Sequence, residues 1–252
     1  MAPAKPPRLR ARKPTRSSIK RTRVEQKRAS KITNLIMRPE NRAIAFQTLL
    51  DENDALSSYS TPSFPVVIEL CRPNKSQVEP FLDECFKLIE STSSADYKAA
   101  QMGWHPKEKM EEMKDSAMMY LLVRRTDTAS TPQTKASDPR EILGFLSFMF
   151  TNDDPPHTDR EVVYIYEVHL AEQLRGAGLG SHLVGMAEEA ARKMGISKTM
   201  LTVFSSNKKA RALYERLGYG KDACSPANRE IRGRIIEADY IIMGKELVME
   251  GK

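Results

Sequence analysis

Residues 162–183 place an aromatic and β-branched run directly before a glycine-rich turn and an amphipathic segment. The run ends in Tyr166-Glu167-Val168-His169-Leu170, and the turn reads Arg175-Gly176-Ala177-Gly178-Leu179-Gly180. A strand, a glycine turn and a helix N-terminus in this order make an anion cradle, because the glycines free backbone N–H groups and the helix end is positive. The pattern suits a pyrophosphate. Glycine turns between a strand and a helix are common, so the flanking residues must show whether this turn is a pyrophosphate site.

A carboxylate and two phenols stand beside this cradle, at Glu167, Tyr164 and Tyr166. Glu167 is a candidate general base acting through water, and the alternative is a strand-edge acid that only binds charged groups of a peptide. Tyr164 is a candidate for peptide binding and Tyr166 for proton handling or positioning, whereas the alternative is that both are core aromatics. Strict alternation places Glu167 on the face opposite to the tyrosines. All three face one cleft only if a β-bulge falls here.

The elements that must position these residues follow from the apolar spacing. It predicts strands at 64–71, 118–123, 142–150, 162–170, 199–204 and 240–243. It predicts helices from residue 24 to 50 with an interruption at Pro39, from a cap at Ser76 to 89, from 179 to 194 and from 207 to 217. Residues 97–113 are predicted as two short helices around Gly103, and 126–139, 152–160 and 220–237 as loops. The order predicts a mixed α+β domain on one sheet.

Composition narrows the class of protein. At 252 residues with 40% hydrophobic content, the chain can bury one sizeable core. Its three cysteines are widely spaced and odd in number, and its four histidines lack ligand spacing, which argues against a disulfide framework and a metal site. No apolar run has the length of a membrane span, and no signal-peptide pattern opens the chain. We therefore expect a reduced, intracellular, metal-free protein.

The positive charge is concentrated at the N-terminus. Residues 1–30 hold eleven Lys/Arg and one acid, so their net charge is +10. The net charge of the full chain is +7, so residues 31–252 carry −3. Residues 1–23 are expected to be a disordered basic tail, either a nuclear-import signal with weak nucleic-acid contacts or a solvated segment without a partner. Residues 24–60 are predicted as a helical segment packing on the domain, which spans 61–248.

Two linked motifs resemble the GCN5-related N-acetyltransferase (GNAT) superfamily over residues 117–220. Arg175-x-x-Gly178-x-Gly180 is similar to that family's acetyl-coenzyme A signature. Asn207-x-x-Ala210-x-x-x-Tyr214-x-x-x-Gly218-Tyr219 is similar to its following helix. The resemblance implies the GNAT fold, with a mixed, mostly antiparallel central sheet flanked by helices, here with an N-terminal helical extension. It also implies acetyl-CoA as co-substrate.

A finer resemblance, from Tyr97 to Tyr240, is to the N-alpha-acetyltransferase D subfamily. It rests on Tyr164-x-Tyr166-Glu167-Val168, on Met200-Leu201-Thr202-Val203-Phe204, and on Gly103-Trp104 followed by a charged helix. That subfamily acetylates the α-amine of histone tails beginning Ser-Gly-Arg-Gly, in histones H-four and H-two-A. The resemblance implies a monomeric enzyme of nucleus and cytoplasm with histone N-terminal peptides as partners. The alternatives are a GNAT enzyme acting on lysine or a small amine, and a non-catalytic chromatin-binding module.

The resemblance also implies residue roles. The strand end would pair its backbone with the pantetheine arm, and the loop N–H groups would hold the pyrophosphate; these residues are Val168, His169 and Leu170, then Gly176, Ala177, Gly178, Leu179, Gly180 and Ser181. Arg175 would add charge near the phosphates or cap the loop. Asn207 would cap its helix and reach coenzyme amides. Tyr214, on the same helix face, would protonate the leaving thiolate or pack on the sheet. The substrate-contacting positions would be Tyr97, Trp104, Tyr164, Thr202 and Tyr240.

Two departures from the subfamily pattern affect the peptide pocket. The aromatic two positions before Trp104 is Met102 here. The acid expected just after the strand ending at Phe150 has Thr151 in its place, and Asp153 or Asp154 in a longer turn can substitute for it.

Overall fold

A computed structural model of the chain describes residues 38–73, 80–126, 141–231 and 233–249. The chain divides into two units, residues 1–42 and 43–252, and the site lies in the second. The predicted basic tail, the Ser76 cap and nearly all of the predicted 126–139 loop fall outside the described residues.

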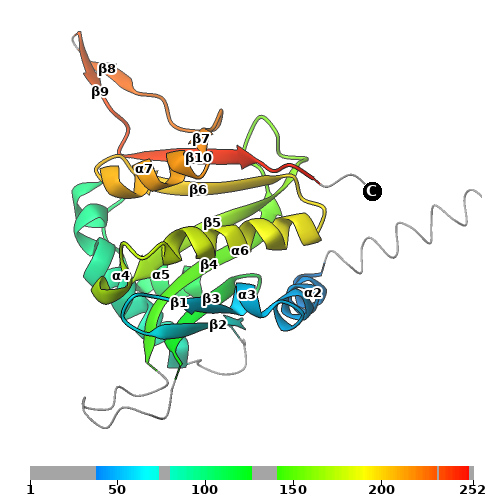
Figure 1. The fold of residues 1–252 in the computed structure, drawn as a ribbon. Coiled ribbons are helices and arrows are strands. Elements are labelled where there is room, and N and C mark those ends of the chain that lie inside the picture. Colours follow the sequence, from blue (N-terminus) through cyan, green and yellow to red (C-terminus); the bar gives the residue numbers. More distant parts are fainter. Residues whose placement is uncertain (1–37, 74–79, 127–140, 232, 250–252) are drawn as a thin grey trace, which may run out of the picture. The chain divides into compact units, whose positions relative to one another are not determined.

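The second unit is built on an eight-stranded sheet in the order β1-β2-β3-β4-β5-β6-β10-β7 (Figure 1). The strands are β1 (Ser58–Ser60), β2 (Pro65–Cys71), β3 (Met119–Arg125), β4 (Ile142–Asn152), β5 (Glu161–Leu170), β6 (Lys198–Phe204), β7 (Gly220–Lys221) and β10 (Tyr240–Glu246). All neighbours are antiparallel except β5 and β6, which are parallel. The α+β fold with a mixed, mostly antiparallel sheet is therefore confirmed.

The helices are α2 (Pro39–Asp51), α3 (Asp54–Ser57), α4 (Pro80–Ala99), α5 (Pro106–Met113), α6 (Leu179–Lys193) and α7 (Lys208–Arg216), and a 3-10 turn, η1, covers Glu172–Leu174. Their predicted positions hold in outline. The start of α2 at Pro39 agrees with the interruption predicted there. Among the differences, α4 continues through Tyr97 as one helix, and a β8–β9 hairpin (Arg229–Ile231 and Arg234–Ile236) lies within the predicted 220–237 loop. Proline suits a first helical turn because its missing N–H would have no partner there.

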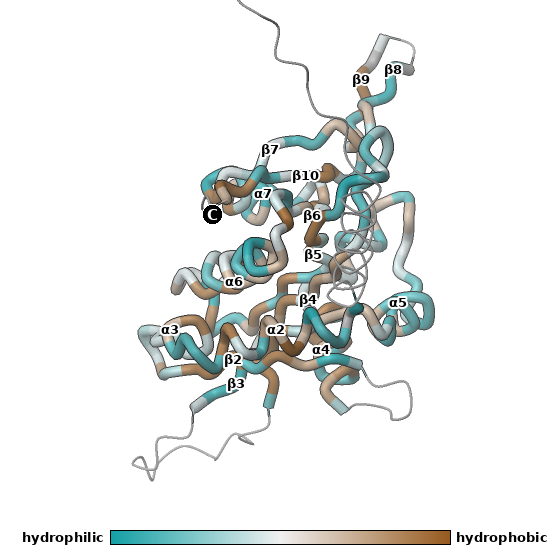
Figure 2. Tube along the Cα trace, turned by 90° about the vertical axis from the view of Figure 1, so that its right-hand side faces the viewer, coloured by the Kyte–Doolittle hydropathy of each residue, from teal (hydrophilic) through white to brown (hydrophobic). Residues whose placement is uncertain are grey.

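Side-chain alternation gives the sheet two buried faces. On β3, Leu121 packs on one face with residues of α6, whereas Tyr120 and Leu122 pack on the other with α4 and α5. Figure 2 shows the resulting pattern, with hydrophobic segments along the strands and a hydrophilic α5. None of the helices in the described part of the chain combines the length and apolarity that crossing a bilayer requires. The three cysteines are free thiols.

Candidate active site

A β-bulge in β5 opens the sheet at the predicted place. Ser147 of β4 lies opposite Glu167, but the next residue, Phe148, lies opposite Ile165, so Tyr166 is the extra residue. On the other side, β5 pairs with β6 only as far as Ile165 opposite Leu201. Beyond this point β6 continues to pair with β10 alone. The predicted bulge and the predicted separation of the two strands are therefore confirmed, and they leave backbone groups unpaired in the gap.

A cavity of about 460 Å³ occupies this gap. The bulge brings Tyr164, Tyr166 and Glu167 to the same cavity, as the cleft hypothesis requires. Among the residues predicted for the site, the cavity lining also includes Tyr97, Val168, His169, Thr202, Asn207 and Tyr214.

Glu167 is held by donors from three elements. Its Oε1 accepts hydrogen bonds from Lys109 Nζ at 2.9 Å and from the Tyr97 hydroxyl at 3.1 Å. Its Oε2 lies 2.6 Å from His169 Nε2. Burial by itself would raise the pKa of Glu167, but the hydrogen bond and charge of His169 and the charge of Lys109 lower it to about 2. A carboxylate this acidic binds a proton weakly, so a role as base needs help from its partners.

The two tyrosines on β5 are neutral phenols at physiological pH. Burial is the main reason that the pKa of Tyr164 rises to about 12, and burial also raises the pKa of Tyr166. The Tyr164 hydroxyl lies 2.6 Å from Thr202 Oγ1 on β6, so these two predicted substrate residues form one polar pair. The rings of Tyr164 and Tyr166 are 5.3 Å apart. Both phenols can donate hydrogen bonds to a ligand in the cavity.

The glycine loop has the geometry of an anion cradle. Gly176 and Gly178 have φ of 77° and 84°, in the left-handed region that other residues rarely adopt, and α6 begins directly after Gly178. The first N–H groups of a helix have no intrahelical acceptor. They therefore suit the pyrophosphate of coenzyme A. Of the two roles predicted for Arg175, the structure shows the cap, since its Nε donates to the Leu170 carbonyl at 2.9 Å.

Helix α7, which follows β6, is capped by Asn207 as predicted. The Asn207 side chain accepts a hydrogen bond from the backbone N–H of Ala210 at 3.1 Å. Tyr214, two turns along, is buried, and its pKa is raised to about 12 by burial and the nearby charge of Glu167. Tyr214 lines the cavity and also packs in the core, so both of its predicted roles remain open.

Two predicted substrate residues lie behind the cavity lining. Trp104 is outside the lining and stacks on Phe86 at 5.6 Å and against Tyr97 at 5.3 Å, so it supports the Tyr97 ring. Tyr240 of β10 is half-buried and lies opposite Phe204 of β6. It packs against a small apolar cluster that Tyr164 also contacts. Direct contact of either with a substrate stays a prediction.

Sequence reasoning missed two members of the site. Lys109 was treated as part of a charged helix, and no local signal separates it from the other charged residues of α5. Thr92, on α4, lies 2.6 Å from His169 Nδ1. His169 was assigned through its backbone alone, although its placement two residues after Glu167 on a strand puts both side chains on one face.

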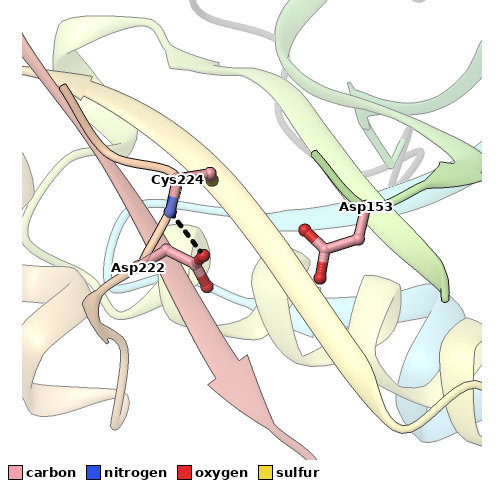
Figure 3. A group of neighbouring side chains, drawn as sticks. All are labelled: Asp153, Asp222 and Cys224. Carbon is pink, nitrogen blue, oxygen red and sulfur yellow. Dashed lines mark hydrogen bonds between the residues drawn. The ribbon is translucent and has the colours of Figure 1, made fainter. Parts of the chain in front are cut away.

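The two aspartates after β4 take different roles. Asp153 is 4% exposed and pairs with Lys198 Nζ at 2.7 Å, and Lys198 also pairs with Asp222 at 2.7 Å. Asp153, Asp222 and Cys224 approach one another as metal ligands would (Figure 3), but the Lys198 ammonium already supplies a cation between the carboxylates. Asp154 lines the cavity instead. Of the two acids, Asp154 is therefore the one available to a ligand in the cavity.

Comparison with known proteins identifies the family of the chain. A model of the acetyltransferase (GNAT) family matches residues 92–219. N-alpha-acetyltransferase 40 of Saccharomyces cerevisiae is 31% identical over 175 residues, which are 61% of this chain and 56% of the yeast protein. The N-acetyltransferase YycN of Bacillus subtilis is 38% identical over 80 residues, 32% of this chain and 49% of that protein. The chain thus spans about half the length of these relatives. A crystal structure of Arabidopsis thaliana NAA60 with a bisubstrate analogue covers 72% of this chain and 100% of its own, at 14% identity and a TM-score of 0.48.

Proposed function

The chain belongs to the acetyltransferase (GNAT) family, and from this premise we propose that it transfers the acetyl group of acetyl-CoA to the free N-terminal α-amine of a protein. One observation carries the proposal. The bulge at Tyr166 sets a carboxylate and two phenols in a cavity beside unpaired strand edges, and the glycine loop follows on the same strand. An amine and a thioester can therefore meet in one place.

The acidity of Glu167 favours an α-amine over a lysine side chain. An α-amine has a pKa of about 7.7–8.0 and a lysine about 10.4, so the lysine costs about 3 kcal/mol more to neutralise. A carboxylate whose pKa is held at about 2 is a weak base. It is better matched to the amine that needs less help. The 31% identity to a protein named N-alpha-acetyltransferase 40 supports the same substrate class.

For the acceptor we propose histone tails that begin Ser-Gly-Arg-Gly. The resemblance to the N-alpha-acetyltransferase D subfamily supports this choice. So does the charge of the site, because Glu112 and Asp154 both line the cavity and can attract a basic peptide. We propose that the enzyme acts as a monomer in nucleus and cytoplasm, with the basic N-terminal residues serving localisation.

The test compares two peptides. A peptide that begins Ser-Gly-Arg-Gly and contains a lysine further along is used with a free and with a blocked N-terminus. Each form is incubated with enzyme and acetyl-CoA, and mass spectrometry locates the acetyl group. We expect acetylation of the free peptide at its first residue only. Equal modification of the blocked peptide would favour a lysine or small-amine acetyltransferase.

A non-catalytic chromatin-binding role is tested by deleting residues 1–23. Turnover of the peptide by the truncated protein is expected to match that of the full chain. Acetyl-CoA binding without turnover, in both forms, would support the non-catalytic alternative.

A further inference from the structure

A chain of short polar contacts leads from the cavity to the interior of α4. Glu167 Oε2 lies 2.6 Å from His169 Nε2, and His169 Nδ1 lies 2.6 Å from Thr92 Oγ1. The Thr92 hydroxyl in turn donates to the backbone carbonyl of Leu88 at 2.6 Å. His169 is 6% exposed and Glu167 is 8% exposed, so bulk water screens these contacts little.

The hydrogens of this chain follow from its donors and acceptors. Thr92 has one hydroxyl proton, and its bond to Leu88 uses it. Thr92 can then only accept from His169, which fixes a proton on Nδ1 and points Nε2 at Glu167. A lone pair on Nε2 facing a carboxylate oxygen at 2.6 Å is repulsive. The contact is favourable when a proton lies between the two atoms.

The other carboxylate oxygen is already committed. Lys109 and Tyr97 both donate to Oε1. A carboxylate has about four lone-pair sites, so three donors leave about one for a molecule in the cavity. Glu167 can therefore contact the cavity on one side and His169 on the other at the same time. This is the arrangement of a relay.

We propose that His169, acting through Glu167, holds the proton that the substrate's ammonium group releases, with Thr92 as the positioning residue that fixes its ring. The inference rests on the proposed acetyl transfer. The proton passes from the ammonium nitrogen, through a water molecule, to the Glu167 carboxylate and on to His169 Nε2. The amine becomes the neutral nucleophile, and the pair passes from a state with a bare Nε2 to the state with a proton between Nε2 and Oε2, which the 2.6 Å contact represents. No oxidant or reductant is involved.

Ionisable side chains surround the Glu167–His169 pair on several sides. The ionisable side chains that face the pair come from five elements: Tyr97 of α4, Lys109 and Glu112 of α5, Tyr120 of β3, Tyr166 of β5 and Tyr214 of α7. Burial keeps these phenols neutral, and Glu112 pairs with Lys109 at 2.8 Å. Among these groups, the charged side chain in direct contact with the Glu167–His169 pair is therefore Lys109.

Thr92→Val tests the positioning role, and Ser91→Ala is its matched control. The Ser91 hydroxyl also donates to the Leu88 carbonyl, at 3.0 Å, but it is exposed. Both variants delete a hydroxyl bound to the same acceptor, and only Thr92 contacts His169. We expect Thr92→Val to lower kcat for the free peptide with its KM little changed, and Ser91→Ala to match the wild type. Equal kcat in all three proteins would overturn the positioning role.

His169→Gln tests the proton-holding role through the pH profile of kcat. Glutamine keeps a polar group near Glu167 but cannot take up a proton. We expect kcat to fall about 10²-fold, as for loss of an acid–base group, and the low-pH limb of the profile to move to lower pH. A lower kcat with the limb unchanged would indicate a structural role and overturn the inference.

Nitrogen NMR of the histidine rings gives a readout that does not depend on turnover. The His169 signals are identified by their absence in His169→Gln, and Thr92→Val is compared with Ser91→Ala. We expect Nδ1 of His169 to carry a proton in the wild type and in Ser91→Ala. An unprotonated Nδ1 would overturn the inference. If the wild type acetylates no amine but the ring shows the expected state, the proposed function fails and the proton-holding pair stands.

Discussion

Replacing Lys109 with methionine should reveal the electrostatic support of Glu167. The Lys109 and Glu167 side chains are 11% and 9% exposed and their charged atoms are 2.9 Å apart. Burial alone would lower the pKa of Lys109, but the charges of Glu167, Tyr97 and Glu112 together more than offset this and raise it. Methionine keeps the apolar stem of lysine and removes its charge. The substitution therefore leaves a buried carboxylate with fewer donors.

The expected cost follows from the pKa of Glu167. A shift from 4.5 to about 2 corresponds to about 3 kcal/mol of stabilisation of the folded state. His169 and Lys109 share this effect, so Lys109→Met should cost about 2 kcal/mol at pH 7, below the 3–5 kcal/mol typical of breaking a buried pair. Because the folded pKa is depressed, the stabilisation is present above pH 4.5 and is lost as pH falls towards 2. The difference between variant and wild type should shrink over the same range.

Urea unfolding at pH 7 and at pH 3 measures the stability cost of Lys109→Met and its decrease at low pH. Lys114→Met is the matched control, because Lys114 at the C-terminal end of α5 pairs with Glu111 at 2.8 Å in an exposed position. An exposed pair contributes about 0–1 kcal/mol, so the control should remain close to the wild type. A loss for Lys109→Met no larger than the control, or one independent of pH, would refute the reasoning. Glu167→Gln completes a double-mutant cycle that isolates the pair.

Gly178→Ala should weaken acetyl-CoA binding about tenfold in calorimetry, since a left-handed non-glycine residue costs about 1–3 kcal/mol and the new methyl would come 2.7 Å from the Tyr59 hydroxyl. The control is Gly185→Ala, which adds a methyl in open space within α6. It should raise thermal stability without changing the affinity for acetyl-CoA. Asp154→Asn should raise the KM of an arginine-bearing peptide several-fold, because Asp154 lines the cavity. Asp153→Asn should reduce stability with KM unchanged, because the Asp153 carboxylate pairs with the buried Lys198. The reverse pattern would contradict the different roles given to these two aspartates. Tyr214→Phe should lower kcat at unchanged KM for acetyl-CoA, because a phenol with a pKa of about 12 is protonated and can donate to the leaving thiolate. An unchanged kcat would leave it a packing residue.

Features that depend on local sequence were predictable. The glycine loop, the cap at Asn207 and the strand before them each require particular residue types at short spacing, and each is present. The position of the bulge followed from a chemical requirement. Tyr164 and Glu167 can share a cavity only if one extra residue lies between them, and the structure places it at Tyr166. Nothing in the β5 sequence itself marks a bulge.

Features that depend on packing between distant segments were not predictable. Lys109 and Thr92 meet the Glu167–His169 pair across 58 and 77 residues of sequence. Their arrival is decided by how α4 and α5 pack on the sheet. The choice between Asp153 and Asp154 likewise depended on where Lys198 of β6 lies. Side chains one residue apart in a turn have no periodicity that assigns one to the core and the other to the cavity.

In the proposed reaction, the single extra residue at Tyr166 links coenzyme binding to proton transfer. It ends the pairing of β5 with β6 after Ile165, which leaves strand backbone available to the pantetheine arm. It also reverses the alternation of side chains, so that Glu167 and His169 enter the same cavity as Tyr164. Because one residue produces both effects, the thioester and the carboxylate are positioned by the same rigid strand. In the proposed transfer, that rigidity would let a weakly basic carboxylate suffice, since proximity replaces much of the driving force that a stronger base would supply.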